Sequence, residues 1–147
     1  MKYIWHSDKD FKHLHPITQV YGICFDKKAN ILILKESENA WNIPGGKPEL
    51  NETPIQTLKR ELREEVDVEI GDHQMIGYLK VLSDNPVFYQ LRFACKIEEI
   101  NKLTIDPSSG VINQRKFVKP SEFFDYVKIE DYREMIAEAI KWYKNNL

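Results

Sequence analysis

A predicted helix with two different faces, at about residues 54–66, is the feature that most restricts the fold of this chain. Placed at about 100° per residue, its apolar residues share one narrow arc: Ile55, Leu58, Leu62 and Val66. An apolar arc of this kind must face a hydrophobic core. A second arc beside it carries three carboxylates: Glu61, Glu64 and Glu65. The helix is therefore expected to cover a core with one face and to present clustered acids with the other.

The residues before this helix predict a loop followed by an abrupt helix start. Two prolines bracket the pair Gly45-Gly46, which indicates a loop with backbone angles that other residues rarely adopt. Thr53 is a good N-cap, Pro54 suits the first helical position, and Gln56 completes a capping box with the threonine. The start of the helix is thus well specified.

The three glutamates of the helix repel one another. Glu61 precedes Glu64 and Glu65 by three and four residues, spacings at which side chains meet and like charges destabilise a helix. A divalent cation removes this conflict, and oxygen ligands suit magnesium or manganese. The upstream loop could add a backbone carbonyl from Gly45 or Gly46. On the helix alone, a solvated acidic face balanced by neighbouring basic residues is an equally good interpretation.

Further strands and a second helix are predicted around this segment from β-branched and apolar runs and from an amphipathic stripe near the end. The strands cover about residues 17–25, 31–34, 75–82, 87–97 and 116–118, and the last helix covers about 130–143. The first two strands are predicted to form a hairpin. The order of elements predicts an α/β fold, an α/β/α sandwich with a mixed β-sheet between helices. The 147 residues suit one domain, with residues 1–15 as an N-terminal extension.

Residues 46–68 resemble the Nudix box. That motif is a glycine, five residues, a glutamate, seven residues, Arg-Glu, an aliphatic residue, any residue, Glu-Glu, any residue, a glycine and an aliphatic residue. The chain matches it at Gly46, at Glu52 and through the run Arg60-Glu61-Leu62-Arg63-Glu64-Glu65. Asp67 replaces the last glycine, and since aspartate tolerates left-handed backbone geometry, we expect a structural adjustment there. The flanking segments resemble the MutT-like branch of the family.

The resemblance implies a Nudix hydrolase that uses magnesium to cleave a pyrophosphate bond in a nucleoside diphosphate linked to another moiety. Glu61, Glu64 and Glu65 would be the catalytic and metal-binding carboxylates, and Gly45 or Gly46 would add a carbonyl ligand. A bound divalent cation lowers the pKa of water and neutralises phosphate oxygens. Either of the first two glutamates would take the proton of the attacking water.

Four further residues receive supporting roles from the same resemblance. Glu52 and Arg60, which are opposite in charge and eight residues apart, would pair and hold the loop against the helix. Lys47 and Lys35 would contact the phosphates of the substrate, although an ordinary surface charge explains each lysine nearly as well. These assignments separate support of the site from contact with the substrate.

Nudix enzymes often use another acid from a late loop, and the matching stretch 110–116 contains none. Asp106, Glu98 and Glu99 are the nearest candidates, and each would equally suit the surface. The sequence therefore leaves open whether a further carboxylate completes the site.

Two other functions remain as alternatives. A non-catalytic Nudix-fold module that binds a nucleotide would usually lack one of the three glutamates, and all three are present here. An isomerase of isoprenoid diphosphates would need a reactive cysteine. Cys24 and Cys95 both lie in apolar runs and are interpreted as buried strand residues. The hydrolase is therefore the favoured interpretation.

The composition restricts partners and location. A net charge of −2 and a pI of about 6.1 argue against a dedicated nucleic-acid binder. The family resemblance implies a small-molecule nucleotide as the partner. No apolar run approaches the ~20 residues of a membrane span, and the first residues lack the features of a signal peptide. We therefore expect a cytoplasmic protein. The substrate is not specified, and the oligomeric state is open, a homodimer included. Base-stacking candidates are Tyr21, Phe88, Tyr89, Phe123 and Tyr126.

Overall fold

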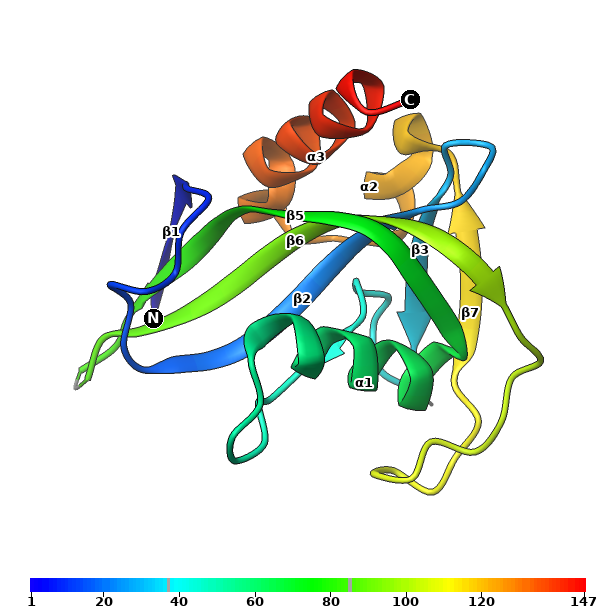
Figure 1. Cartoon of the computed structure of the whole chain (residues 1–147), viewed down its shortest axis with the longest axis horizontal. Helices are drawn as coiled ribbons and strands as arrows, with labels where there is room; N and C mark the ends of the chain where they lie inside the picture. Colours follow the sequence, from blue (N-terminus) through cyan, green and yellow to red (C-terminus); the bar gives the residue numbers. More distant parts are fainter. Residues whose placement is uncertain (37, 85) are drawn as a thin grey trace.

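A curved β-sheet lies between helices in the computed structural model, which describes residues 1–36, 38–84 and 86–147 (Figure 1). Its strands are β1 (Lys2–Ser7), β2 (Ile17–Phe25), β3 (Ile31–Lys35), β4 (Gly45–Gly46), β5 (Val68–Leu82), β6 (Phe88–Ile100) and β7 (Gln114–Val118). Its helices are α1 (Pro54–Val66), α2 (Phe123–Tyr126) and α3 (Arg133–Asn145), with 3-10 turns at Pro120–Glu122 and Glu130–Tyr132.

The sheet is mixed, as predicted. Its strand order is β1-β5-β6-β2-β3-β7, and β4 pairs with β2. The central pair β2–β6 is parallel, with Ile17 opposite Tyr89 and Phe25 opposite Lys96. The other pairs are antiparallel, and among them is the predicted hairpin of β2 and β3, in which Phe25 lies opposite Ile31.

The sheet has a core on each face because side chains alternate along its strands. On β3, Leu32 and Leu34 belong to the core under α1, whereas Ile31 and Ile33 belong to the core under α3. Figure 1 shows α1 on one face of the sheet and α2 and α3 on the other. This arrangement confirms the α/β/α sandwich.

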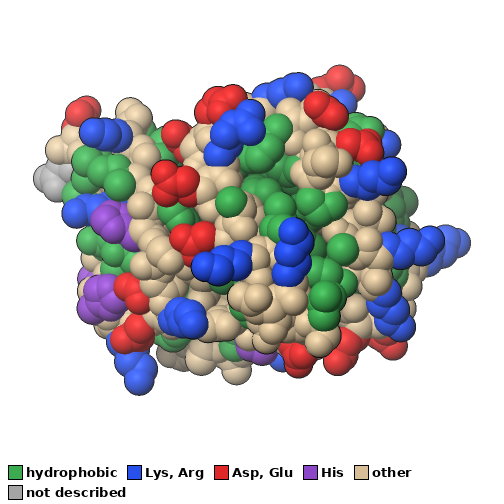
Figure 2. Space-filling view, turned by 90° about the horizontal axis from the view of Figure 1, so that it is seen from above, with side chains coloured by type: hydrophobic (Ala, Val, Ile, Leu, Met, Phe, Trp, Pro, Cys, Tyr) green, Lys and Arg blue, Asp and Glu red, His purple; other side chains and the backbone are tan. Residues whose placement is uncertain are grey.

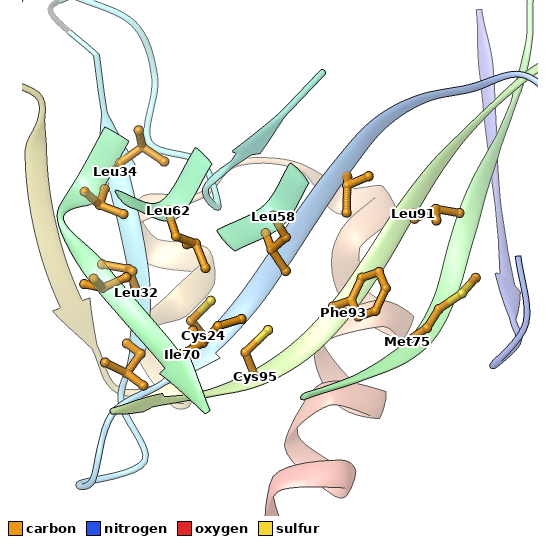
Figure 3. Packing of buried hydrophobic residues seen from close by; sticks show 14 of the residues in the cluster. Cys24, Leu32, Leu34, Leu58, Leu62, Ile70, Met75, Leu91, Phe93 and Cys95 are labelled. Atoms are coloured by element: carbon orange, nitrogen blue, oxygen red, sulfur yellow. The ribbon is translucent and has the colours of Figure 1, made fainter. Parts of the chain in front are cut away.

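The apolar arc of α1 packs onto the sheet as predicted. Leu58, Leu62 and Val66 are fully buried. Figure 3 shows the first two pointing from the helix toward the strands that carry Cys24 and Cys95. Both cysteines are buried and free, in agreement with their interpretation as strand residues.

Both ends of α1 follow from its sequence. Thr53 and Gln56 form the predicted capping box, and a proline occupies the first turn. At the other end Asp67 has φ 54° and ψ 45°, the left-handed geometry expected where the motif has glycine, and its N–H donates to the carbonyl of Leu62. The replacement of that glycine is therefore accommodated by the backbone.

Three differences from the sequence prediction concern strands. β5 and β6 are longer than expected because irregular register, for example between Ile70 and His73, interrupts the alternation on which the prediction relied. Gly45-Gly46, expected in a loop, pairs with β2 as a two-residue strand. Residues 1–15 were expected to be an extension, yet Lys2–Ser7 joins the sheet beside β5.

Candidate active site

The glycine pair of β4 brings the loop into direct contact with its neighbours. A Cβ on Gly45 would lie 2.0 Å from Cδ1 of Tyr21 and 2.3 Å from the carbonyl oxygen of Val20. A Cβ on Gly46 would lie 2.5 Å from the carboxyl group of Glu61. Gly45 has no room for a side chain against the backbone of β2, whereas a side chain at Gly46 would require the carboxyl group of Glu61 to move.

Glu65 points from α1 toward this loop. Its Oε1 accepts a hydrogen bond of 3.0 Å from the N–H of Gly45. Burial raises the pKa of Glu65 to about 8; the Gly45 hydrogen bond opposes this shift, and the nearby charges of Glu61 and Asp106 add to it. Burial also raises the pKa of Glu61. These carboxyl groups are costly to ionise without a positive partner.

Arg60 joins the loop to the helix. Its Nε donates to Oε2 of Glu52 at 2.7 Å, and its Nη2 donates to Oε1 of Glu52 at 3.0 Å and to the carbonyl of Lys47 at 2.9 Å. The bidentate pairing with Arg60 lowers the pKa of Glu52 to about 2. The predicted ion pair is therefore present in the structure.

The same arginine also reaches the acidic arc. Its Nη1 donates to Glu61 at 2.9 Å and to Glu64 at 3.3 Å. Arg60 thus supplies part of the positive charge that the clustered glutamates require. Within residues 1–36, 38–84 and 86–147, no three His, Cys, Asp or Glu side chains converge in a ready-made metal cluster.

The donor set nevertheless suits a hard divalent cation. The buried carboxylate of Glu65 has one N–H partner among the described residues, Gly45, and Glu61 lies against Gly46. Carboxylate oxygens are the ligands that magnesium prefers in proteins. These groups fit such an ion once Arg60 shares or releases its bonds to the acidic arc. The ligand role of a glycine carbonyl remains a prediction, since Gly45 contacts Glu65 through its N–H.

Among the candidates for a further acid, the structure brings Asp106 to the site. It is 1% exposed, and its charge is among the causes that raise the pKa values of Glu61 and Glu65. Asn113 connects it to the helix, because its Nδ2 donates to Asp106 at 3.3 Å and to the main-chain oxygen of Glu65 at 3.0 Å. The sequence does not indicate this role of Asn113, because an amide carries no charge to mark it as a partner of the acids.

The other two candidates lie apart from this group. Glu98 and Glu99 are exposed residues of β6 and border a surface hollow together with Lys59 and Arg63. Of the two predicted phosphate contacts, Lys47 is exposed, and Lys35 places its Nζ 6.0 Å from the ring centre of Trp41. The roles of both lysines remain predictions.

A cavity of about 300 Å³ beside the glycine loop was not foreseen. Tyr21, Asn42, Arg92 and Tyr132 contribute to its wall. A signal existed in the sequence, because Arg92 lies between the apolar residues Leu91 and Phe93 of β6. Of the stacking candidates, Tyr21 borders this cavity, whereas Phe123 lies in the core under α3.

A mixed sheet between helices, with a glutamate-rich helix against a glycine loop, defines a class of protein that comparison with family models identifies. Residues 15–143 match the model of the NUDIX domain. The chain therefore belongs to the Nudix family, and the resemblance found in its motif is confirmed.

Two relatives show the range of the similarity. The chain is 39% identical over 66 residues to an 8-oxo-dGTP diphosphatase of Proteus vulgaris. This alignment covers 42% of this chain and 56% of the Proteus protein. The chain is 24% identical over 138 residues to an ADP-ribose pyrophosphatase of Methanocaldococcus jannaschii. That alignment covers 88% of this chain and 76% of the archaeal protein. The chain thus spans little more than half of the Proteus protein.

Solved structures share the fold. The Bacillus subtilis pyrophosphohydrolase BsRppH has a TM-score of 0.74 with 17% identity, over 97% of this chain and 90% of that chain. MutT, in a study of the Aliivibrio salmonicida and Vibrio cholerae proteins, has a TM-score of 0.62 with 23% identity, over 86% of this chain and 97% of that chain.

The surface carries charges of both signs. Figure 2 shows Lys and Arg side chains interspersed with Asp and Glu side chains over the face seen from above. Among the described residues, no helix combines the length and the apolar character needed to cross a bilayer.

Proposed function

We propose that this chain is a magnesium-dependent pyrophosphohydrolase acting on a nucleoside diphosphate linked to another moiety. The observation that carries the proposal is the buried carboxylate of Glu65, held by the N–H of Gly45 beside Glu61. Clustered carboxylates in such a position suit the binding of a hard cation. The names of the relatives, which include a diphosphatase, an RNA pyrophosphohydrolase and an ADP-ribose pyrophosphatase, support this class of reaction.

The acidic arc would hold the ion through Glu61, Glu64 and Glu65, with manganese as a substitute for magnesium. When bound, the cation neutralises phosphate oxygens and lowers the pKa of water. Glu61 or Glu64 would accept the proton of the attacking water. Lys47 and Lys35 would bind the phosphates.

The substrate is to be found with a panel assayed in magnesium buffer. The panel contains nucleoside triphosphates, oxidised nucleotides, ADP-ribose, dinucleoside polyphosphates, NADH and nucleotide sugars, and the release of phosphate, pyrophosphate or nucleoside monophosphate is measured. Hydrolysis of at least one member is expected. Tight binding of a member without any hydrolysis would support the non-catalytic nucleotide-binding module instead.

Glu65→Gln tests the site on whichever substrate the panel identifies. Loss of one electrostatic element that stabilises transition-state charge typically lowers turnover by about 10²–10³-fold, and we expect kcat to fall by that amount. Glu134→Gln is the matched control, since Glu134 is exposed on α3 on the opposite face of the sheet. Equal kcat values for the two variants would remove Glu65 from the site.

Cation binding has a readout that does not depend on turnover. A ligand that binds only the folded state raises the melting temperature. Titration with magnesium or manganese should therefore raise the Tm of the protein, and the double variant Glu64→Gln/Glu65→Gln should show a much smaller rise. An equal rise in both proteins would place the ion elsewhere.

A further inference from the structure

The last turn of α1 is fastened to the segment between β6 and β7. The final carbonyl groups of a helix have no partner within the helix, so they need donors from elsewhere. Asn113 supplies one of these donors, because its Nδ2 donates to the main-chain oxygen of Glu65 at 3.0 Å. Asp67, which follows the helix, accepts two further bonds from Thr104. Residues 101–113 are therefore held at two points against the end of the helix that carries Glu65.

Asn113 differs from Thr104 because it also contacts an acid. Its Nδ2 donates to Oδ2 of Asp106 at 3.3 Å, and the same nitrogen donates to Glu65. A main-chain oxygen can only accept a hydrogen bond, so Nδ2 and not Oδ1 of the amide must face the helix. One NH₂ group with two hydrogens thus binds the helix and the acid together.

The carboxylate of Asp106 is held by a different residue at each of its oxygens. Oδ1 accepts from the N–H of Ser108 at 3.0 Å and from the hydroxyl of the same residue at 2.9 Å. Oδ2 accepts from Asn113, its one hydrogen-bond partner among the described residues. The two bonds from Ser108 lie within one turn of the chain. The bond from Asn113 is therefore the one that ties the carboxylate to α1.

Stability alone does not explain an amide at position 113. The side chain of Asn113 is 2% exposed, and its Oδ1 is buried without a hydrogen-bond partner among the described residues. A buried polar atom left without a partner costs at least as much free energy as one typical hydrogen bond contributes. The Oδ1 of this amide therefore offsets part of what its Nδ2 contributes. The placement of Asp106 gives the amide a reason that stability does not.

The charge of Asp106 acts on the proposed cation site. It contributes to the raised pKa of both Glu61 and Glu65. A negative charge that opposes the ionisation of its neighbours also attracts a cation to the same place. Residues that orient the groups around a metal from behind typically change the affinity for the metal by about 10–100-fold when they are replaced.

We propose that Asn113 is a positioning residue of this site, which fixes Asp106 against the end of α1 so that its charge acts on the glutamates of the helix. Asn113 acts through Asp106 and takes no part in bond cleavage. This inference rests on the proposed function, because it assumes that the glutamates bind a divalent cation.

Calorimetric titration with Mn²⁺ tests this role without turnover. The unaltered protein is compared with Asn113→Ala, with Asp106→Asn and with the variant that combines both changes. Each single change should raise the Kd for Mn²⁺ by about 10–100-fold. The double variant should bind within about twofold of Asp106→Asn, because an amide that acts through an acid has no effect once the charge of that acid is gone.

Two results of this titration would overturn the proposal. Losses of affinity that multiply in the double variant would show that Asn113 acts independently of Asp106. An Asn113→Ala variant that binds Mn²⁺ as tightly as the unaltered protein would show that the amide has no influence on the site.

Thr104→Val is the matched control. Valine is similar in shape to threonine and uncharged, and the change removes the 2.8 Å bond from the hydroxyl of Thr104 to Asp67, which fastens the same segment to the same end of α1. This variant should be less stable and should keep its affinity for Mn²⁺. Equal weakening of Mn²⁺ binding by Thr104→Val and Asn113→Ala would assign the effect to the attachment of the segment and overturn the proposal.

A second variant serves if Asn113→Ala does not fold. Asn113→Ser keeps one O–H donor, which cannot bind both the oxygen of Glu65 and the carboxylate of Asp106. Mn²⁺ binding should therefore still weaken in this variant.

Failure of this proposal is distinguishable from failure of the proposed function. Weaker Mn²⁺ binding by Asn113→Ala, in a protein that hydrolyses no member of the substrate panel, would uphold the role of Asn113 and refute the hydrolase. Hydrolysis of a panel member together with unchanged Mn²⁺ binding by Asn113→Ala would refute the role of Asn113 alone. Absence of Mn²⁺ binding to the unaltered protein would contradict both.

Discussion

Arg60 is the residue through which the loop and the helix are joined. It contacts Glu52, the carbonyl of Lys47, and two glutamates of the acidic arc, and its side chain is 17% exposed. Such a side chain is held by bonds on every side, so it orients the loop and the glutamates at once. Its contacts explain why the Nudix box fixes the number of residues between the glutamate of the loop and the arginine of the helix.

The pairing of Glu52 with Arg60 predicts a dependence of stability on pH. The pKa of Glu52 is about 2 in the folded protein and 4.5 as the ordinary value, so the ionised form is favoured by folding. Its stabilisation is fully present above about pH 4.5 and is lost as the pH falls toward about 2. Glu52→Gln should lower the free energy of unfolding by about 1–3 kcal/mol at neutral pH, a value between those of exposed and buried pairs. Urea denaturation between about pH 2 and 7 measures both effects.

The control for this experiment is Glu134→Gln, at an exposed residue of α3. This variant should keep the slope of stability against pH that the unaltered protein shows between about pH 2 and 4.5. A Glu52→Gln variant with the same slope would mean that the ion pair contributes nothing to folding.

A second prediction at this scale decides between the late-loop acids. Asp106 lies beside the glutamate helix and is buried, whereas Glu99 is exposed on β6. Asp106→Asn should lower kcat by about tenfold or more on the substrate from the panel, since it removes a charge beside the reacting groups. Glu99→Gln should leave kcat unchanged. A larger loss of kcat in Glu99→Gln than in Asp106→Asn would assign the role of the further acid to Glu99 instead of Asp106.

At the scale of the element, the end of α1 is held by a residue that departs from the family motif. Asp67 has left-handed geometry, and its carboxylate accepts bonds from the N–H of Thr104 at 2.9 Å and from its hydroxyl at 2.8 Å. Glycine at this position would adopt the same backbone angles without a side chain to bind the loop. Aspartate therefore ends the helix and also attaches the segment after β6 to it.

Asp67→Ala should lower the free energy of unfolding by about 1–3 kcal/mol, since it loses the bonds to Thr104 and keeps the left-handed strain. Asp67→Gly loses the same bonds and relieves the strain, so it should be the more stable of the two variants. Urea denaturation of both proteins measures the difference. An alanine variant more stable than the glycine variant would show that the backbone changes its geometry there.

The elements that the sequence predicts best are those specified by local signals. Both ends of helix α1 agree with the prediction, because its cap, its apolar arc and its terminal residue are all encoded within the segment. Strand β5 is longer than predicted, because its irregular register breaks the alternation of side chains. The place of Asp106 depends on Asn113 and on a loop that folds back to α1, and this long-range contact has no local signal.

At the scale of the whole molecule, β1 connects one edge of the sheet to the last helix. Trp5 and Ser7 on β1 both donate hydrogen bonds to Glu138 on α3. Gly77 on β5 makes room for this strand, since a Cβ there would lie 2.3 Å from the carbonyl oxygen of His6 and 2.5 Å from the ring of Trp5. The N-terminal segment is thus part of the structure that supports α3.

Gly77→Ala should displace β1. We expect the free energy of unfolding to fall by about 1–3 kcal/mol, as for other overpacked sites, and residues 1–8 to become more sensitive to proteases. Gly71→Ala on the same strand is the matched control, because its Cβ meets the end of the flexible Glu98 side chain. Limited proteolysis followed by mass spectrometry locates the cleavage. Equal sensitivity of both variants would show that β1 tolerates the extra methyl group.

The parallel pairing of β2 with β6 has a consequence for synthesis of the chain on the ribosome. Ile17 finds its neighbour Tyr89 about seventy residues later, so the centre of the sheet stays open while the first half of the protein emerges. The β2–β3 and β5–β6 hairpins each join strands that are close in sequence, so each can form early. The parallel pairing of β2 with β6, which joins the two hairpins, requires that both have been made. We therefore expect the newly made N-terminal half to expose the apolar faces of β2 until about residue 100 has left the exit tunnel, which makes this stage the one most open to aggregation and to chaperones.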